Sequence, residues 1–370
     1  MKGLKIIELA SVLAGPSVGQ FFAELGAEVI KIESPATGGD VTRSWRLPQE
    51  QSDDRSAYFC AVNWGKKSVA ADLYTEAGKN LVHQLASSAD MVIASYKPGD
   101  AEKLGVDYRT LSSLNKRLIY GQVTGYGAHN ARVGYDAVIQ AEAGFMSLNG
   151  EADGLPLKMP VALIDILAAH HLKEGLLLAI IERMQTGVGK VVEVSLIQAA
   201  LASLANQATN WLVGGVLPQR QGSAHPNIAP YGDIFKTSDE FDLLLAIGND
   251  KQFAALCAVL QRTDLPQHDH YITNAQRVKN RLSLNNILQQ AIGKMAAKDL
   301  VDKLHYAQIP AGIIQNVKQA LAMPEADRLR LSHGQLAGIR TFVASHYTHK
   351  LLPPPHFGEH TAEIIGNLRA

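Results

Sequence analysis

The sequence is poor in cysteine and carries no net charge. Its two cysteines, Cys60 and Cys257, lie far apart, so the chain has neither a CxxC motif nor a disulfide framework. The 35 basic residues equal the 35 acidic ones, and this argues against a general nucleic-acid-binding protein, which usually carries a basic excess. The balance still leaves room for a local basic pocket that binds a small anion.

Long apolar runs are also missing. The longest, Leu176–Ile181, is too short to span a bilayer. The first residues lack the basic segment, apolar stretch and small-residue cleavage site of a signal peptide. We therefore expect no membrane association and a cytoplasmic location in which the cysteines stay reduced. With 46% hydrophobic and 19% charged residues, the composition is typical of a globular protein.

The 370 residues are too many for one ordinary core, so two domains are expected. Strand-like and helix-like segments alternate over residues 1–212, which predicts a large, doubly wound, Rossmann-like α/β domain. Residues 213–230, rich in Gly, Pro, Gln and Arg, are typical of a linker. A smaller α+β domain is predicted over residues 231–325, and the tail, 326–370, is expected to return to the large domain.

The chain opens with a predicted βαβ unit. A strand-like segment, Leu4–Leu9, leads through Gly15 and Pro16 into a helix-like segment, and a second strand, Glu28–Ile32, follows. The first loop is a natural site for a phosphate or an adenine ring. It lacks the Gly-x-Gly-x-x-Gly fingerprint, since only Gly15 and Gly19 are near, so a nicotinamide-dependent enzyme is disfavoured.

Two further segments lie near the predicted ligand edge of the sheet. The loop Ser95–Gly99 follows a short apolar strand, and ligands of α/β proteins bind at such carboxyl ends. Lys66 and Lys67 stand beside another strand. They are either ordinary solvated charges or a pair that binds an anion.

Asp165 is the only charged residue in the run Met159–Ala169. An isolated buried carboxylate is unfavourable, so three explanations stay open: a helix N-cap, a hydrogen-bonded polar group of the core, or a carboxylate nucleophile. His170 and Glu174 share a helix face further on, at a spacing that metal ligands could use. Without a third ligand the pair is typical of an ordinary polar surface, so no metal site is predicted.

Several motifs together resemble the family III CoA-transferases, the CaiB/BaiF group that includes formyl-CoA transferase. The resemblance covers nearly the whole chain. It is carried by Ile6–Leu9 with Ala14–Pro16, Leu25–Glu33, Asn63–Ser68, Asp90–Gly105, Gly134–Asp136 with Gln140, Thr186–Lys190, Ile309–Gly312 and Gly358–Thr361.

This resemblance implies that Asp165 is the catalytic nucleophile. In the family, the carboxylate attacks an acyl-CoA thioester and forms a mixed anhydride. An enzyme–CoA thioester follows, and CoA then passes to an acceptor acid. The reference pKa of Asp, about 3.9, leads us to expect an ionised side chain at neutral pH without a base. Because an anhydride is easily hydrolysed, the pocket is expected to exclude water.

The resemblance also implies which residues contact CoA. They are Val12, Leu13 and Ala14 after the first strand, Ala71 near the adenine, Ser95 and Tyr96 in place of an Asn–Phe pair, and Lys103 in place of an arginine. Lys103 keeps the charge but lacks the bidentate guanidinium. Tyr135 and Asp136 match an active-site pair that varies within the family.

The departures from the family pattern leave two alternatives to the transferase. The first is an acyl-CoA racemase of the same fold, although such racemases carry a His where this chain has Tyr135. The second is a non-catalytic CoA-binding homologue, because residues 226–232 lack the run of glycines that covers the intermediate in some members. The family further implies an interlocked homodimer. It implies acyl-CoA and a carboxylic acid as substrates, with no tightly bound cofactor. The sequence does not name the two acids.

Overall fold

The computed structural model describes residues 1–51, 53–344 and 349–369 and divides into two compact units. Unit 1 consists of Met1–Ala143, Met159–Ala205 and Pro324–Ala370, and unit 2 of Gly144–Lys158 and Asn206–Met323. The domain limits that the sequence suggests, at 212, 230 and 325, stay predictions.

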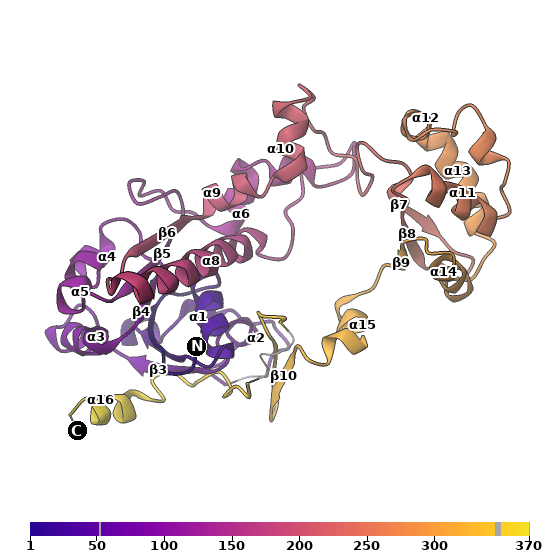
Figure 1. The fold of residues 1–370 in the computed structure, drawn as a ribbon. Coiled ribbons are helices and arrows are strands. Elements are labelled where there is room, and N and C mark those ends of the chain that lie inside the picture. The colour runs from indigo at the N-terminus through magenta and orange to yellow at the C-terminus, as the bar shows by residue number, and fades with distance from the viewer. Residues whose placement is uncertain (52, 345–348, 370) are drawn as a thin grey trace. The chain divides into compact units, whose positions relative to one another are not determined.

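Unit 1 is built on a six-stranded sheet in which every neighbouring pair is parallel (Figure 1). The strands, in the order β3-β2-β1-β4-β5-β6, are Lys66–Ala70, Glu28–Glu33, Lys5–Leu9, Met91–Ala94, Ile119–Thr124 and Val191–Ser195. This is the strand order of a dinucleotide-binding fold, in which the chain changes direction between β1 and β4. The predicted doubly wound α/β fold is confirmed.

Helices cover both faces of this sheet, so its central strands are completely enclosed, as parallel sheets require. Helices α1 and α8 pack on one face, while α3, α5 and α16 belong to the other. The helices of unit 1 are α1 (Ala14–Glu24), α2 (Ala57–Cys60), α3 (Glu76–Ser88), α4 (Asp100–Lys103), α5 (Tyr108–Leu114), α6 (Asp136–Glu142), α8 (Leu163–Thr186), α9 (Leu196–Ala202) and α16 (Thr361–Arg369), with short 3₁₀ turns at Pro35–Thr37, Val41–Ser44 and Pro324–Ala326.

Two helices follow β6 in the alanine-rich stretch 196–212. Helix α9 ends at Ala202, and α10 (Ala205–Leu212) begins at a residue with a left-handed backbone, φ 47°. A residue in that conformation cannot continue a right-handed helix, so the alanine-rich pattern is divided there. Within the described part of the chain, no helix is long and apolar enough to cross a membrane.

The tail of the chain belongs to unit 1. After the hairpin β10 (Arg330–His333) and β11 (Leu336–Ile339), residues 349–369 run along the outer strand β3. The Gly358 N–H donates to Ser68 Oγ at 2.8 Å, and Thr361 Oγ1 accepts from the Ala70 N–H at 2.9 Å. These bonds satisfy polar groups along an edge strand, which would otherwise be open to pairing with another chain.

Unit 2 has its own core between an antiparallel sheet and helices. The sheet has the order β7-β8-β9, and its apolar side chains, such as Phe235 and Leu245, are buried against the helices. This confirms the smaller α+β architecture. Its elements are α7 (Phe145–Leu148), β7 (Tyr231–Lys236), β8 (Asp242–Ala246), α11 (Asp250–Val259), the 3₁₀ turn Leu265–Gln267, α12 (Asn274–Lys279), α13 (Arg281–Ile292), α14 (Ala297–Tyr306), β9 (Ala311–Ile313) and α15 (Val317–Leu321).

Candidate active site

A cavity of about 210 Å³ lies in unit 1 at the carboxyl edge of the parallel sheet. The loops after β1, β4 and β5 form its walls, and the first residues of α6 and α8 complete it. The crevice between β1 and β4 is where the chain changes direction, and this is the place at which α/β proteins bind their ligands.

The structure brings eight of the ten predicted site residues to this cavity. They are Val12, Leu13, Ala14, Ser95, Tyr96, Tyr135, Asp136 and Asp165. Ala71 instead lines a separate hollow beside α3 and α16. Lys103 lies on α4, largely exposed, with its ammonium 2.9 Å from Asp100 Oδ1. The contacts of all ten with CoA stay predictions.

Asp165 is the third residue of α8, and only 9% of it is exposed. Among the residues that the structure describes, none donates a hydrogen bond to its carboxylate or pairs with it. Asp165 is not the N-cap, which is Ala162, nor a hydrogen-bonded polar group of the core. Both structural explanations offered by the sequence are therefore wrong. An unpaired, buried carboxylate facing a cavity is the arrangement that the nucleophile hypothesis requires.

The ionisation of Asp165 differs from the expectation based on its reference pKa. Burial, and secondly the negative charge of Asp136, raise the pKa of the Asp165 carboxyl from 3.8 to about 7. At pH 7 the group is therefore about half ionised rather than fully so. Burial of the carboxyl group is the larger of the two causes.

Asp136 fixes the first turn of α8. Its Oδ1 accepts a hydrogen bond from the Ile164 N–H at 2.8 Å, and its Oδ2 accepts one from Gln140 Nε2 at 2.7 Å. Gln140 Oε1 in turn accepts from the Met159 N–H at 2.9 Å. The N-terminal N–H groups of a helix lack partners within it, so Asp136 supplies the missing acceptor. The position of Asp165 therefore depends on Asp136 and Gln140.

Three side chains near the site were not among the predicted residues. Lys97 and Arg132 line the cavity, and the Arg132 guanidinium pairs with the Glu142 carboxylate at 2.5 Å. Lys97 follows β4 directly, so the position of its loop was a usable signal, whereas Arg132 lies in an irregular loop without periodicity. The Tyr58 phenol is half-buried, and burial followed by the charges of Asp165 and Asp136 raises its pKa. Nothing in the sequence near Tyr58 indicates that it lies close to Asp165 and Asp136.

A second cavity of about 380 Å³ adjoins the first, and the two share Ser11, Ser95 and Tyr96. It extends over the carboxyl end of β2, past Ser34. Burial raises the pKa of the Tyr96 phenol to about 12, so the ring between the two cavities stays neutral. Together the cavities form a crevice that an extended ligand could follow toward Asp165.

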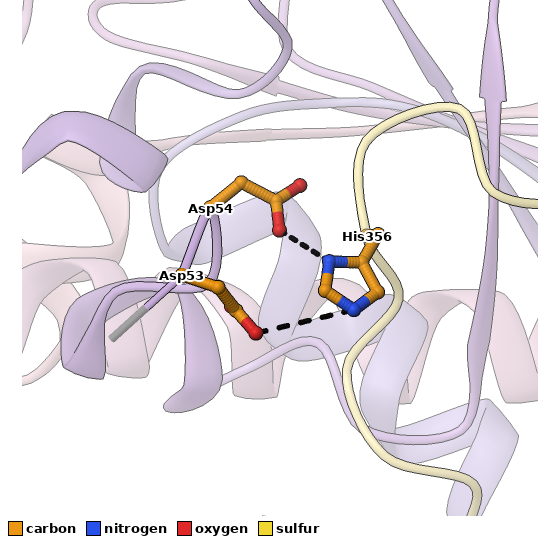
Figure 2. A group of neighbouring side chains, drawn as sticks. All are labelled: Asp53, Asp54 and His356. Atoms are coloured by element: carbon orange, nitrogen blue, oxygen red, sulfur yellow. Dashed lines mark hydrogen bonds and ion pairs between the residues drawn. The ribbon is translucent and has the colours of Figure 1, made fainter. Parts of the chain in front are cut away.

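Another group of potential metal ligands lies away from this crevice. Figure 2 shows Asp53, Asp54 and His356, whose ligand atoms lie within 4.8 Å of one another. The two carboxylates face opposite ring nitrogens: Asp54 Oδ1 lies 2.5 Å from Nδ1, and Asp53 Oδ2 lies 3.9 Å from Nε2. Asp53 also pairs with Arg55, and Asp54 Oδ2 accepts from the Phe357 N–H at 2.6 Å. The group is already joined internally by a hydrogen bond between the tail and the turn at 53–54.

Comparisons with known proteins agree with this geometry. The model of the family described as CoA-transferase family III matches residues 1–361. A succinate–glutarate CoA-transferase from Agrobacterium fabrum is 38% identical, with 100% of this chain and 95% of that protein covered. A human succinyl-CoA:glutarate CoA-transferase is 32% identical over 99% of this chain and 85% of its own length. A crystal structure of a CAIB/BAIF family protein from Brucella suis matches with a TM-score of 0.87 at 38% identity, covering 99% and 98% of the two chains.

Proposed function

This chain belongs to CoA-transferase family III and is a CoA-transferase, and we propose that Asp165 is the group through which it moves CoA between acids. One observation carries the proposal: a buried carboxylate without a hydrogen-bonding partner, among the described residues, faces the cavity at the carboxyl edge of the sheet. Burying such a group destabilises the fold, and a chemical role explains why the residue is kept.

The proposed reaction has four steps at one carboxyl group. An Asp165 oxygen attacks the thioester carbon of the donor, the C–S bond breaks, and a mixed anhydride and CoA thiolate form. The thiolate attacks the aspartyl carbonyl, which releases the donor acid and leaves an enzyme–CoA thioester. The acceptor carboxylate then attacks this thioester and forms a second anhydride and CoA thiolate. Finally the thiolate attacks the acceptor carbonyl, which gives the new acyl-CoA and restores Asp165.

The environment of Asp165 suits these steps. Once ionised, a carboxylate with a raised pKa is more basic and more nucleophilic than an ordinary one. The anhydride is easily hydrolysed, so the proposed reaction requires that bound acyl-CoA keep water away from it. The crevice formed by the two cavities runs past Tyr96, and we propose that it holds the pantetheine arm, while Lys97 attracts the anionic part of CoA. CoA then takes part only as a piece of the substrate, with no separate tightly bound cofactor.

For the acids, we propose small dicarboxylates. The names of the Agrobacterium and human relatives point to succinate and glutarate. Arg132 lines the cavity, and a guanidinium is suited to bind a second carboxylate. The Arg132→Gln variant is expected to raise KM for succinyl-CoA by about tenfold, as the loss of one charged contact would. KM for acetyl-CoA should change little, and an equal rise for both donors would contradict the proposed substrate class.

We further propose a cytoplasmic homodimer. Three large apolar side chains of α8, Leu178, Ile181 and Met184, are at least half exposed, which is unusual for a solvated helix face and supports association with a second copy. Light scattering coupled to gel filtration measures the mass directly. Replacing Ile181 by Glu is expected to shift a dimer toward the monomer, and a wild-type monomer would contradict this part of the proposal.

The decisive experiment replaces Asp165 by Asn. Transfer is expected to stop, and hydroxylamine should no longer trap an acyl-enzyme. Mass spectrometry of the wild-type protein incubated with acyl-CoA should find the adduct on the peptide that contains Asp165. The control is Asp90→Asn, the same change at the opposite edge of the sheet, where Asp90 pairs with Arg183 at 3.0 Å. Retained turnover in Asp165→Asn would refute the mechanism. Deuterium uptake at the α-carbon without an acceptor acid would favour a racemase instead.

A further inference from the structure

The loop between β1 and α1 contains a strained residue at the wall of the active-site cavity. Val12 has φ 71°, in the left-handed region that a branched side chain rarely adopts. Strain of this kind persists only where the surrounding structure imposes it, and it concentrates at functional sites. The question is therefore which residues hold Val12 in this conformation.

Asp40 and Lys31 form hydrogen bonds with the backbone of this loop. The Val12 N–H donates to Asp40 Oδ1 at 3.3 Å, while Lys31 Nζ donates to the Ala10 carbonyl at 2.7 Å. The two side chains also pair with each other, with Lys31 Nζ 2.8 Å from Asp40 Oδ2. One buried ion pair thus holds the backbone on both sides of Ser11, and the side chains at 11–14 are left to line the cavity.

This ion pair is itself rigidly supported. Lys31 lies 2.9 Å from Glu8 Oε1, and Glu8 Oε2 lies 2.7 Å from Lys66 Nζ. None of these three side chains is more than 1% exposed. Thr42 adds two hydrogen bonds to Asp40 Oδ1, from its N–H at 3.0 Å and from its hydroxyl at 2.8 Å. Buried charges that are all paired cannot move singly without leaving a partner uncompensated, so Asp40 has one available position.

We propose that Asp40 is a positioning residue for acyl-CoA: it holds Val12 in the left-handed conformation, and this sets the surface of the loop that the pantetheine arm meets. The inference rests on the proposed function, because it takes the crevice beside Asp165 as the CoA site. Asp40 does not line the cavity that contains Asp165, although it does line the adjoining cavity of about 380 Å³. By this inference, its effect on acyl-CoA passes through the backbone of Val12.

The test is a double-mutant cycle between Asp40→Asn and Val12→Gly. In Asp40→Asn either orientation of the amide places its NH₂ group against donors, the Val12 and Thr42 N–H groups on one side or the Lys31 ammonium on the other, so the support of the loop is weakened. A glycine in place of Val12 adopts positive φ without strain, so it should need no such support. KM for acyl-CoA, kcat, and Kd for CoA by calorimetry are measured for the four proteins, with Asp90→Asn as the control.

We expect Asp40→Asn to raise KM and Kd about tenfold when Val12 is retained, in line with the strain of a left-handed valine, and kcat to change less. In the Val12→Gly background, the same substitution should raise them by less than about threefold, as expected once that strain is absent. Equal effects in both backgrounds would show that Asp40 acts without Val12, either on the fold or on CoA directly in the cavity that it lines, and they would overturn the inference. If wild-type protein neither bound CoA nor turned over any acyl-CoA, the proposed function would fall first, and this inference with it.

A variant that leaves the buried charges intact covers the case in which Asp40→Asn does not fold. Val12→Pro fixes φ near −65° and removes the N–H that donates to Asp40. Loss of CoA binding in Val12→Pro, with a melting temperature close to that of the wild type, is expected. Undiminished CoA binding in a folded Val12→Pro protein would overturn the inference.

Discussion

The Asp136 carboxylate accepts a hydrogen bond from the backbone N–H of Ile164, at 2.8 Å, in the first turn of the helix that carries Asp165. Asp136 therefore affects Asp165 in two ways. The hydrogen bond positions the start of α8, and the negative charge raises the pKa of Asp165. A helix N-terminus favours negative charge, so on its own it would lower that pKa. Burial and Asp136 together outweigh this effect.

The first prediction separates the charge of Asp136 from its hydrogen bond. For the wild-type protein, kcat/KM should rise with pH through a midpoint near 7, because Asp165 must lose its proton to attack. Asp136→Asn keeps an acceptor for the Ile164 N–H but removes the charge. The midpoint should therefore fall by roughly half to one pH unit, as for the loss of one nearby like charge.

Asp136→Ala is the matched control, because it removes both the charge and the hydrogen bond. It should show the same shift of the pH midpoint, with an additional drop of about tenfold in the plateau, the usual effect of misplacing a reacting group. A pH profile of kcat/KM that is identical in Asp136→Asn and wild-type protein would contradict this account of the Asp165 pKa.

The second prediction concerns stability. A raised pKa means that the folded protein binds the proton of Asp165 more tightly than the unfolded chain does. The ionised form therefore destabilises the fold. This loss in the free energy of unfolding is absent below pH 3.8, grows as pH rises to about 7, and is constant above that. Asp165→Asn should consequently be more stable than the wild type by about 2–4 kcal/mol at pH 8.

Urea unfolding at two pH values measures this difference. The gain in free energy of unfolding from Asp165→Asn should shrink toward zero near pH 4, where the wild-type carboxyl is protonated as well. A variant less stable than the wild type at pH 8 would show that the Asp165 carboxylate contributes to the fold. That result would also weaken its identification as a group kept for chemistry.

Much of the fold could be predicted because it follows from local patterns. Short apolar strands alternating with helix-like segments predicted the parallel sheet, and the carboxyl ends of its strands are where the cavity with Asp165 lies. Asp165 stood out because it was the only charge in an apolar run. A residue that breaks a local rule is often functional, and the structure gives this one no structural explanation.

What could not be predicted depends on contacts between distant residues. Asp136 and Ile164 are 28 positions apart, and nothing near either one indicates that they meet. Lys66 was interpreted either as a solvated charge or as part of an anion-binding pair, and both interpretations are wrong. Its ammonium is buried 2.7 Å from Glu8, a residue that looks unremarkable in the first strand. The strained backbone of Val12 likewise arises from tertiary contacts with Asp40.

The third prediction substitutes a glycine beside Glu8 to test whether the buried charges hold this carboxylate in place. Gly19 lies in α1 where a Cβ atom would be 1.8 Å from Glu8 Oε2, which is held by Lys31 and Lys66 and cannot withdraw. Gly19→Ala should therefore destabilise the protein by roughly 2–4 kcal/mol in urea unfolding. Gly366→Ala is the control, because nothing lies within 4 Å of its Cβ position in α16. It should gain about 0.5–1 kcal/mol, and similar losses in both variants would contradict the account.

The last prediction concerns the junction between the tail and the turn at 53–54 (Figure 2). Burial opposes ionisation of Asp54, but the Phe357 N–H and His356 outweigh it and hold the pKa of Asp54 below its usual value. The stability that Asp54 contributes is therefore present above the unfolded value of 3.8, and it is lost as pH falls through the lower folded value. Asp54→Asn should loosen the tail, and hydrogen exchange at Phe357 and in α16 should become faster at pH 7.

Metal addition distinguishes this hydrogen-bonded junction from a metal site. A single ion binds one ring nitrogen, so it could hold both carboxylates only after His356 turned and Asp53 released Arg55. Saturating Zn²⁺ or Mn²⁺ should consequently leave the melting temperature of the wild type unchanged, because a ligand stabilises a protein only if it binds the folded state. A rise in melting temperature that disappears in His356→Gln would establish a metal site and refute this interpretation. Faster exchange of the tail in Asp54→Asn, without any response to metal, would establish that Asp54 joins the tail to the turn by hydrogen bonds.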